Sequence, residues 1–159
     1  MRIDIPIDPA DIPTAQEKGV RVVKGVPMFY KKAPLVKFES LLEKTLSPLY
    51  GKLRIPDGHP ASVHITYLFG YPKSTPKRNL VDMARMTKRP DGDNLSKAIV
   101  DALGDKYARD KATRRFYIKR RGFFADDGQV NPLVISKFYT TGTPKVVITI
   151  KETELLPNP

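Results

Sequence analysis

Alternation of apolar and polar residues predicts several β-strands. In residues 62–69 every second side chain is apolar, which is typical of a strand with one buried face. Residues 130–139 and 145–151 also predict strands, and the turn at 140–144 fits a hairpin that joins them. Isoleucines alternate in residues 3–7, which suggests a further strand near the N-terminus.

The segment 33–49 predicts an amphipathic helix. Its leucines and Phe38 recur at steps of three and four residues, so they share one side of the helix. Pro34 suits an early helical position, where its missing N–H costs nothing, and Gly51 follows the expected end. We expect this helix to pack against the sheet. The valines in 20–26 indicate only a short extended piece.

Residues 93–103 predict a second helix with two unlike sides. Leucine, isoleucine and alanine residues form one apolar stripe. Asp93 is a natural N-cap, because a helix N-terminus favours a carboxylate. Asp93, Lys97 and Asp101 follow one another at four-residue spacing on the opposite side. This helix is therefore expected to pack by one side and to present Asp-Lys-Asp on the other.

Composition restricts the possible chemistry. The 159 residues suffice for one domain with a core, and 40% of them are apolar. No apolar run approaches the length of a membrane span, and the first residues lack a signal-peptide pattern, so we expect a cytoplasmic protein. The chain has no cysteine and two histidines. Any metal would thus be held mainly by oxygen, which favours Mg²⁺ or Mn²⁺.

The formal net charge of +11 predicts a polyanionic partner, foremost nucleic acid. Residues 70–89, expected to be a loop or irregular connector, hold six basic residues and one acid, and residues 105–121 hold eight basic residues and two acids. The second segment also carries Tyr107, Phe116 and Tyr117, which would add base stacking to phosphate contact. A solvated loop without a ligand is the alternative. The cations expected to contact DNA are Lys73, Lys77, Arg78, Lys88, Arg89, Arg114, Arg115, Lys119, Arg120 and Arg121.

Four aspartates are candidate metal ligands. Asp91 and Asp93 flank Gly92, so a tight backbone turn would let both carboxylates face one point. Asp127, on a later segment, would complete the site, with Asp126 as a supporting or alternative ligand. Mg²⁺ prefers about six oxygens and keeps several waters, so a few carboxylates suffice.

Lys97 is the candidate catalytic cation. Its ammonium would neutralise charge as a phosphodiester transition state forms, and Asp101 would orient it across one helical turn. A capped helix with a ladder of surface charges is the structural alternative, and two aspartates at this spacing are weak evidence alone. The second acidic pair, the net charge and the lack of other ligands favour metal-dependent phosphodiester chemistry.

Three stretches resemble the motifs of the RusA-type Holliday junction resolvases, namely RPDGDNLSKAIVDAL (89–103), GFFADDGQV (122–130) and ISKFY (135–139). The similarity extends over about residues 20–151. The resemblance implies an α+β fold, here a small mixed sheet of about four strands packed with two helices. It also implies a homodimer that nicks paired strands of four-way DNA junctions with Mg²⁺.

By position, the resemblance implies roles for particular residues. Asp91, Asp93 and Asp127 would be the essential carboxylates and Lys97 the catalytic lysine, and the supporting residues would be Asp126, Asn94 and Asp101. The chain would be a single domain over 1–159, with an irregular leader at 1–19, a basic insertion at 104–125 and a frayed tail at 152–159. The leader and the insertion depart from the family pattern.

Two other functions are alternatives. A non-catalytic basic protein that binds DNA junctions would explain the charge, although clustered carboxylates would repel DNA unless a metal were bound. A nucleotidyl or glycosyl transferase would explain the Asp-x-Asp spacing, but such folds usually need a longer chain with several crossovers.

Overall fold

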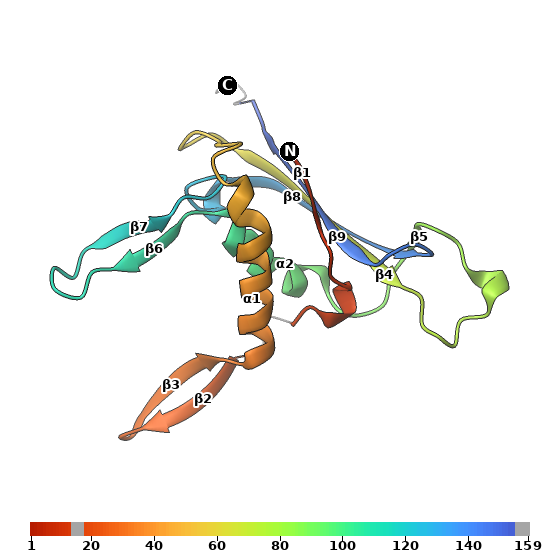
Figure 1. The fold of residues 1–159 in the computed structure, drawn as a ribbon, viewed down its shortest axis with the longest axis horizontal. Helices are drawn as coiled ribbons and strands as arrows, with labels where there is room; N and C mark the ends of the chain where they lie inside the picture. Colours follow the sequence, from red (N-terminus) through yellow and green to blue (C-terminus); the bar gives the residue numbers. More distant parts are fainter. Residues whose placement is uncertain (14–17, 155–159) are drawn as a thin grey trace.

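A five-stranded sheet forms the centre of the computed structural model, which describes residues 1–13 and 18–154 (Figure 1). Its strands are β1 (Arg2–Ile5), β4 (Ala61–Gly70), β5 (Ala84–Arg85), β8 (Val130–Thr140) and β9 (Lys145–Glu152). Their order across the sheet is β1-β9-β4-β8-β5. β4 and β8 are parallel and the other neighbours antiparallel. Two helices, α1 (Ala33–Leu46) and α2 (Gly92–Leu103), complete the fold, so the predicted α+β class is confirmed.

β4 lies at the middle of the sheet and carries much of the core. Val63, Ile65 and Tyr67 are fully buried on the side that faces the helices, whereas His64 between them is exposed. This alternation follows the two-residue period of a strand. Phe38 of α1 and Ile99 of α2 belong to the same buried cluster, so both helices cover one face of the sheet.

The predicted hairpin between the last two strands is wrong. β8 and β9 are not neighbours, because β4 lies between them and pairs with both. The chain crosses over the end of β4 at residues 141–144. Gly70 ends β4 there, and a Cβ on it would lie 3.2 Å from the Pro144 ring. The crossing therefore packs closely on the end of the central strand, where glycine leaves room for the Pro144 ring.

Both helices differ slightly from their predicted bounds. α1 ends at Leu46, and a 3-10 turn (Ser47–Leu49) follows it. α2 begins at Gly92, so its N-cap is Asp91 and not Asp93, which lies in the first turn. The Asp91 side chain makes no capping hydrogen bond. Its carboxylate therefore forms no hydrogen bond with the backbone of the first helical turn.

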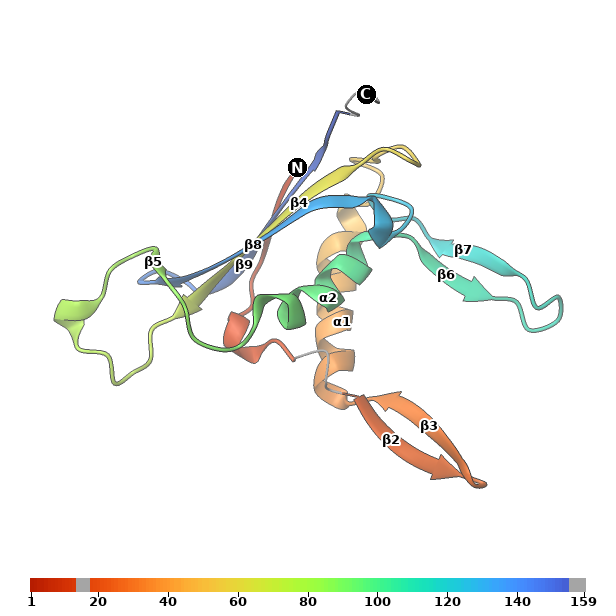
Figure 2. The same ribbon diagram turned by 180° about the vertical axis from the view of Figure 1, so that it is seen from behind.

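Two β-hairpins project from this body (Figures 1 and 2). The first pairs β2 (Lys18–Val23) with β3 (Val26–Lys31), where only a short extended piece was expected. The second pairs β6 (Lys106–Arg109) with β7 (Phe116–Arg120) and lies within the predicted insertion at 104–125. That segment is thus an ordered hairpin.

The remaining segments are short. β1 and a 3-10 turn (Pro9–Asp11) make up part of the leader predicted at 1–19, whose residues 14–17 lie outside the described part. The connector at 70–89 contains β5 and a 3-10 turn, and Asp82 ties it to the sheet by accepting from Thr140 Oγ1 at 2.9 Å. The tail predicted at 152–159 is described only to residue 154. Within the described ranges, no helix is long and apolar enough to cross a membrane.

Candidate active site

α2 is held against the sheet by a close approach and a buried pair of hydroxyl groups. A Cβ on Gly92 would lie 2.7 Å from Ile135 Cγ2 of β8, so the helix start can approach the sheet only with glycine there. Gly92 therefore serves close packing and not the tight turn expected from the sequence. Ser96 Oγ donates to the Gly92 carbonyl at 2.7 Å. Its single proton is then used, so Tyr67 OH donates to Ser96 Oγ at 2.9 Å.

Lys137 of β8 fixes the backbone that leads to Asp91. Its ammonium donates to the carbonyl oxygens of Lys88 and Pro90, both at 2.8 Å. The two carbonyls flank Arg89, so one ammonium holds the bend at Arg89 against the sheet. The first half of the candidate site is thus positioned from both sides, by Lys137 before Asp91 and by Ser96 after it.

A single glutamine holds the second acidic pair. Gln129 Oε1 accepts from the Ala125 amide at 2.7 Å, and its Nε2 donates to the carbonyls of Pro56 and His59 at 2.8 Å. Asp126 caps the short 3-10 turn of residues 127–129, since its carboxylate accepts from Gly128 N at 2.7 Å. The Asp126 carboxylate is therefore partly used by the turn, whereas Asp127 begins the turn and is exposed.

The two halves meet in a small recess, which we call the acidic recess. It has a volume of about 190 Å³. Lys97 Nζ lies 3.6 Å from Asp101 Oδ1, across the helical turn that the sequence spacing predicted. Side chains from α2, the acidic turn and β8 thus surround one cavity. Its lining residues are Asp93, Ser96, Lys97, Val100, Asp101, Asp127 and Leu133.

A second recess adjoins the first and shares Asp101 and Asp127 with it. Asp126 and Tyr107 line only this second recess of the two, which has a volume of about 260 Å³. Asp91 lines neither recess and is exposed at the N-cap of α2. The structure therefore places Asp93, Lys97, Asp101 and Asp127 around one cavity and leaves Asp91 and Asp126 beside it.

The donor set of the acidic recess fits a hard divalent cation. Asp93 and Asp127 are exposed carboxylates on the same cavity, and carboxylate oxygen is the ligand that Mg²⁺ and Mn²⁺ prefer. Among residues 1–13 and 18–154, no three acidic or histidine side chains are grouped closely enough to share one ion. Binding a metal through all of Asp91, Asp93 and Asp127 would thus require these exposed side chains to turn toward one another.

The base of the β6–β7 hairpin is built on a buried carboxylate. Asp105 is only 1% exposed in its side chain and accepts from Arg54 at 2.7 Å and from Gly122 N at 2.6 Å. Burial disfavours the charged guanidinium, but Asp105 and Asp57 together hold the pKa of Arg54 above its ordinary value. Phe123 and Phe124, fully buried, then continue into the core.

Arg120 differs from the other cations predicted to contact DNA. Its guanidinium lies 4.2 Å from the centre of the Tyr50 ring, pairs with Glu43 at 3.3 Å and donates to the Ala102 carbonyl at 3.1 Å. Burial raises the pKa of the neighbouring Tyr50 to about 12, so this ring stays neutral beneath the cation. Arg120 therefore fixes the hairpin to α1 and α2, and its charge is engaged within the protein.

The other cations predicted to contact DNA are exposed. They lie on two separate parts of the molecule, the connector at 70–89 and the β6–β7 hairpin, which project in different directions in Figures 1 and 2. These exposed residues are Lys73, Lys77, Arg78, Lys88, Arg89, Arg114, Arg115, Lys119 and Arg121.

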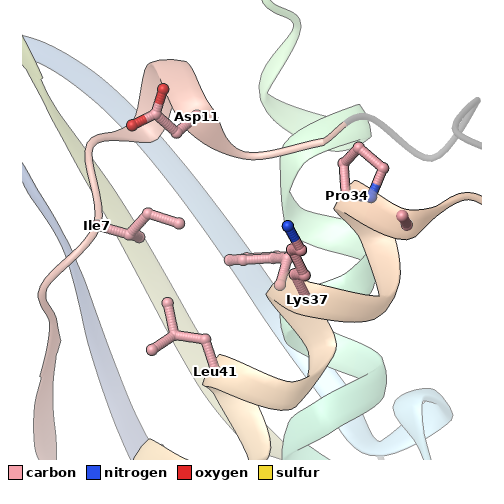
Figure 3. Close-up of a pocket in the computed structure, with 7 residues that line it drawn as sticks. Ile7, Asp11, Pro34, Lys37 and Leu41 are labelled. Carbon is pink, nitrogen blue, oxygen red and sulfur yellow. The ribbon is translucent and has the colours of Figure 1, made fainter.

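A larger cavity, of about 360 Å³, lies between the N-terminal segment and the first half of α1 (Figure 3). Its walls are mostly apolar, with one acid and one lysine, and no residue predicted for the site lines it. The lining residues are Ile7, Asp11, Ala33, Pro34, Lys37, Phe38 and Leu41. Its position and composition do not suit phosphodiester chemistry.

Carboxylates and a lysine around one recess, on a small basic α+β domain, are the features of an enzyme that cleaves nucleic acid. The comparisons agree with this class. The family model described as Endodeoxyribonuclease RusA matches residues 6–151, and a comparison with curated proteins found no significant match. The chain therefore belongs to the RusA endodeoxyribonuclease family, an enzyme family that binds and cleaves DNA junctions and generally depends on a divalent metal.

Several positioning residues were not identified from the sequence. Lys137 lies in the ISKFY stretch that supported the resemblance, but its role as a clamp before Asp91 was not predicted. Gln129 likewise belongs to the GFFADDGQV stretch without an assigned role. An alternating strand with a lysine among apolar residues could have drawn attention to Lys137. Asp105 is paired with Arg54 and Gln129 donates to Pro56 and His59, and these partners are too far away in sequence to leave a local pattern.

Proposed function

We propose that this chain is a Mg²⁺-dependent, structure-selective endonuclease that resolves four-way DNA junctions by paired nicks, with Mn²⁺ as a possible substitute. The observation that carries the proposal is the acidic recess, where Asp93 and Asp127 from distant segments lie with Lys97 around one cavity. The cytoplasmic location expected from the sequence is part of this proposal.

Asp91, Asp93 and Asp127 would hold the metal, with Asp126 beside them. The bound metal would polarise the scissile phosphate and activate a water. The protein's own groups position the substrate: Lys97 supplies a positive charge next to the phosphate, and Asp101 keeps that ammonium at the edge of the recess. Asn94, half-buried in the first turn of α2, would support the neighbouring Asp93.

DNA would approach over the two basic surfaces that flank the recess. The proposed phosphate contacts are Lys73, Lys77, Arg78, Lys88, Arg89, Arg114, Arg115, Lys119 and Arg121. Phosphate contacts of this kind orient a duplex without reading its sequence. Arg120 is left out, because its guanidinium already contacts Tyr50, Glu43 and Ala102.

A homodimer would place two such recesses about a twofold axis, which suits paired cuts in symmetry-related strands of a junction. The exposed β2–β3 hairpin supports this proposal. Large apolar side chains that stay exposed on one projecting element are typical of a protein–protein contact. The exposed residues are Val20, Val22, Val23, Val26, Met28, Phe29 and Tyr30.

The proposed function is tested with a labelled four-way junction and Mg²⁺. We expect paired nicks from the wild-type protein and no detectable nicking from Asp93→Asn. Lys97→Ala should slow cleavage on the order of a hundredfold while junction binding changes little, because the lysine acts on the transition state. Lys44→Ala, an exposed lysine on α1, is the matched control.

Three outcomes would contradict the proposal. The wild-type protein could bind junctions tightly without nicking under any divalent metal, as expected of a non-catalytic binding protein. Asp93→Asn could cut as fast as the wild type. Equal losses of binding and cleavage in Lys97→Ala would instead make Lys97 a structural residue.

A further inference from the structure

The β6–β7 hairpin has two chemically different faces. In its register, Tyr107 lies opposite Ile118 and Arg109 lies opposite Phe116, so these four side chains share one face. Tyr117 pairs with Ala108 and lies on the other face. The three aromatic residues that the sequence places together are therefore separated, with two on one face and one on the other.

The face with two aromatic residues is open. Tyr107 is 50% exposed, Ile118 is 39% exposed and Phe116 is 72% exposed. Arg109 stacks over the Phe116 ring at 5.8 Å from its centre and donates to the Arg114 carbonyl at 2.9 Å. These side chains therefore face solvent along the hairpin, and Arg109 holds its guanidinium beside the Phe116 ring at the outer end. We call Tyr107, Ile118 and Phe116 the aromatic face.

The aromatic face begins at the proposed active site. Tyr107 lines the recess that also contains Asp126 and Asp127, and from there the hairpin extends away from the body (Figures 1 and 2). The anchors at its base, Asp105 and Arg120, limit how far this end of the hairpin can move. A DNA strand bound at the acidic recess would therefore reach Tyr107 first and Phe116 further out.

The charge of the hairpin selects the occupant. The strands and turn that carry the aromatic face also carry exposed Lys106, Lys111, Arg114, Arg115 and Lys119, of which Lys119 shares the face of Tyr117. A second copy seated on this hairpin would bring its own cations against this local cluster, whereas a polyanion would neutralise it. Aromatic side chains among cations are the usual platform for single-stranded nucleic acid.

Paired DNA would not use this face. In a duplex the flat surfaces of the bases are covered by their neighbours, so aromatic side chains can stack only on bases that have left the stack. The aromatic face therefore suits nucleotides that are unpaired, next to the strand whose phosphate lies at the acidic recess.

We propose that Tyr107, Ile118 and Phe116 bind unpaired nucleotides of the DNA strand that leaves the acidic recess. The preferred substrate class is then branched DNA with a short unpaired stretch at the branch point. This inference rests on the proposed function for the position of the cut strand, and it goes beyond that function by naming the state of the adjacent bases.

The test compares two junctions, one fully paired and one with a short run of unpaired thymidines at the branch point. Binding is measured by fluorescence anisotropy with a chelator present, so that no cleavage occurs. We expect the wild-type protein to bind the junction with unpaired thymidines more tightly. A 2-aminopurine in the unpaired run should lose fluorescence on binding, because it stacks on an aromatic ring.

Variants assign the effect to one face. Tyr107→Leu and Phe116→Leu should each weaken binding of the unpaired junction about tenfold and that of the paired junction by less than about twofold. Tyr117→Leu is the matched control, since Tyr117 is 52% exposed on the opposite face of the same hairpin. Phe116→Tyr should restore binding, and equal melting temperatures would show that the variants are folded.

The inference is overturned if the wild-type protein does not distinguish the two junctions, if each variant loses equally on both, or if Tyr117→Leu matches Phe116→Leu. A separate cleavage assay distinguishes it from the proposed function. A protein that prefers unpaired junctions but nicks none would contradict only the proposed function. A protein that nicks paired junctions without any preference would contradict only the further inference.

Discussion

The two projecting hairpins are alike in shape and differ in chemistry. β2–β3 exposes seven large apolar residues and is joined to α1 at its base by an exposed pair, Lys31 and Glu39, at 2.6 Å. β6–β7 exposes four such residues among many cations, and its base is anchored by the buried Asp105. An isolated two-stranded hairpin is marginally stable in water, so each needs either an anchor or a partner.

The difference shows how one fold can supply two kinds of surface. β6–β7 has a rigid base next to the acidic recess, as expected of an element that must hold DNA in register with a reacting phosphate. β2–β3 lies away from that recess and carries an apolar surface that suits another protein, here proposed as a second copy.

The largest expected effect concerns the anchors. Arg54→Met leaves the buried Asp105 carboxylate with only the Gly122 amide, so we expect the free energy of unfolding to fall by about 3 kcal/mol. Lys31→Met removes an exposed pair and should cost less than about 1 kcal/mol. Urea denaturation of both variants measures the difference. Equal losses would show that the two hairpins are anchored alike.

The second effect concerns DNA affinity. Replacing five exposed cations of β6–β7 by glutamine should weaken junction binding about a hundredfold at low salt and make its salt dependence shallower. Four of them are Lys111, Arg114, Arg115 and Lys119, and the fifth is Arg121, which directly follows β7.

Arg21→Gln with Lys24→Gln on β2–β3 is the matched control, because both residues are exposed on the apolar hairpin. We expect this control to change affinity by less than about threefold. Anisotropy titrations over a range of salt concentrations measure both variants. If the control loses as much as the β6–β7 variant, then both hairpins contact DNA and the contrast between them does not hold.

The third effect concerns assembly. Phe29 of β3 is 75% exposed, so Phe29→Lys should weaken dimerisation at least about tenfold by placing a charge in the apolar contact. Phe116, with a similar 72% exposure on β7, gives the matched variant Phe116→Lys, which should leave the oligomeric state unchanged. Sedimentation velocity measures both. A wild-type monomer, or a monomer only with Phe116→Lys, would contradict the assignment.

The smallest effect concerns the two hairpin tips. Hydrogen bonds from the Thr113 amide and hydroxyl lower the pKa of Asp110, which lies in the β6–β7 turn. Because the folded-state pKa is below the ordinary value of 3.8, the stability it adds is present above that pH and is lost as pH falls through the lower folded value. The β2–β3 turn at Lys24 and Gly25 has no such carboxylate.

In NMR spectra recorded from neutral to acid pH, the chemical shift of the Thr113 amide should therefore change at low pH. The chemical shifts of the Lys24 and Gly25 amides should stay constant. Asp110→Asn, which removes the titrating group, is the control and should abolish the change in the Thr113 chemical shift. Equal movement at both tips would indicate that acid loosens hairpins of this kind in general.

Local patterns in the sequence were sufficient for much of the fold. The alternation in 62–69 and the leucine spacing of α1 predicted elements that the structure contains, because burial of one face imposes a period of two on a strand and 3.6 on a helix. The β2–β3 hairpin, of which only a short extended piece was predicted, also has a local pattern in the sequence. Lys24-Gly25 between valines is a pattern typical of a two-residue hairpin turn, and the structure has both residues at positive φ.

The pairing of strands that are distant in sequence could not be predicted from local patterns. β8 and β9 follow each other closely, and the shortest connection predicted a hairpin, yet β4 lies between them. The N-cap of α2 was misplaced for a similar reason. Gly92 continues the helix because it packs on Ile135, a residue more than forty positions later. Neither partner is visible in a local window.

The sequence by itself determined the family, the chemical groups and the spacing that sets Lys97 one turn from Asp101, because these depend on residue types and on the helical period. Only the tertiary structure brought Asp127 to the recess of α2 and placed Arg120 against Tyr50, because both contacts join segments far apart in the chain. It also separated Tyr107 and Phe116 from Tyr117, since strand register and pleat decide which side chains share a face.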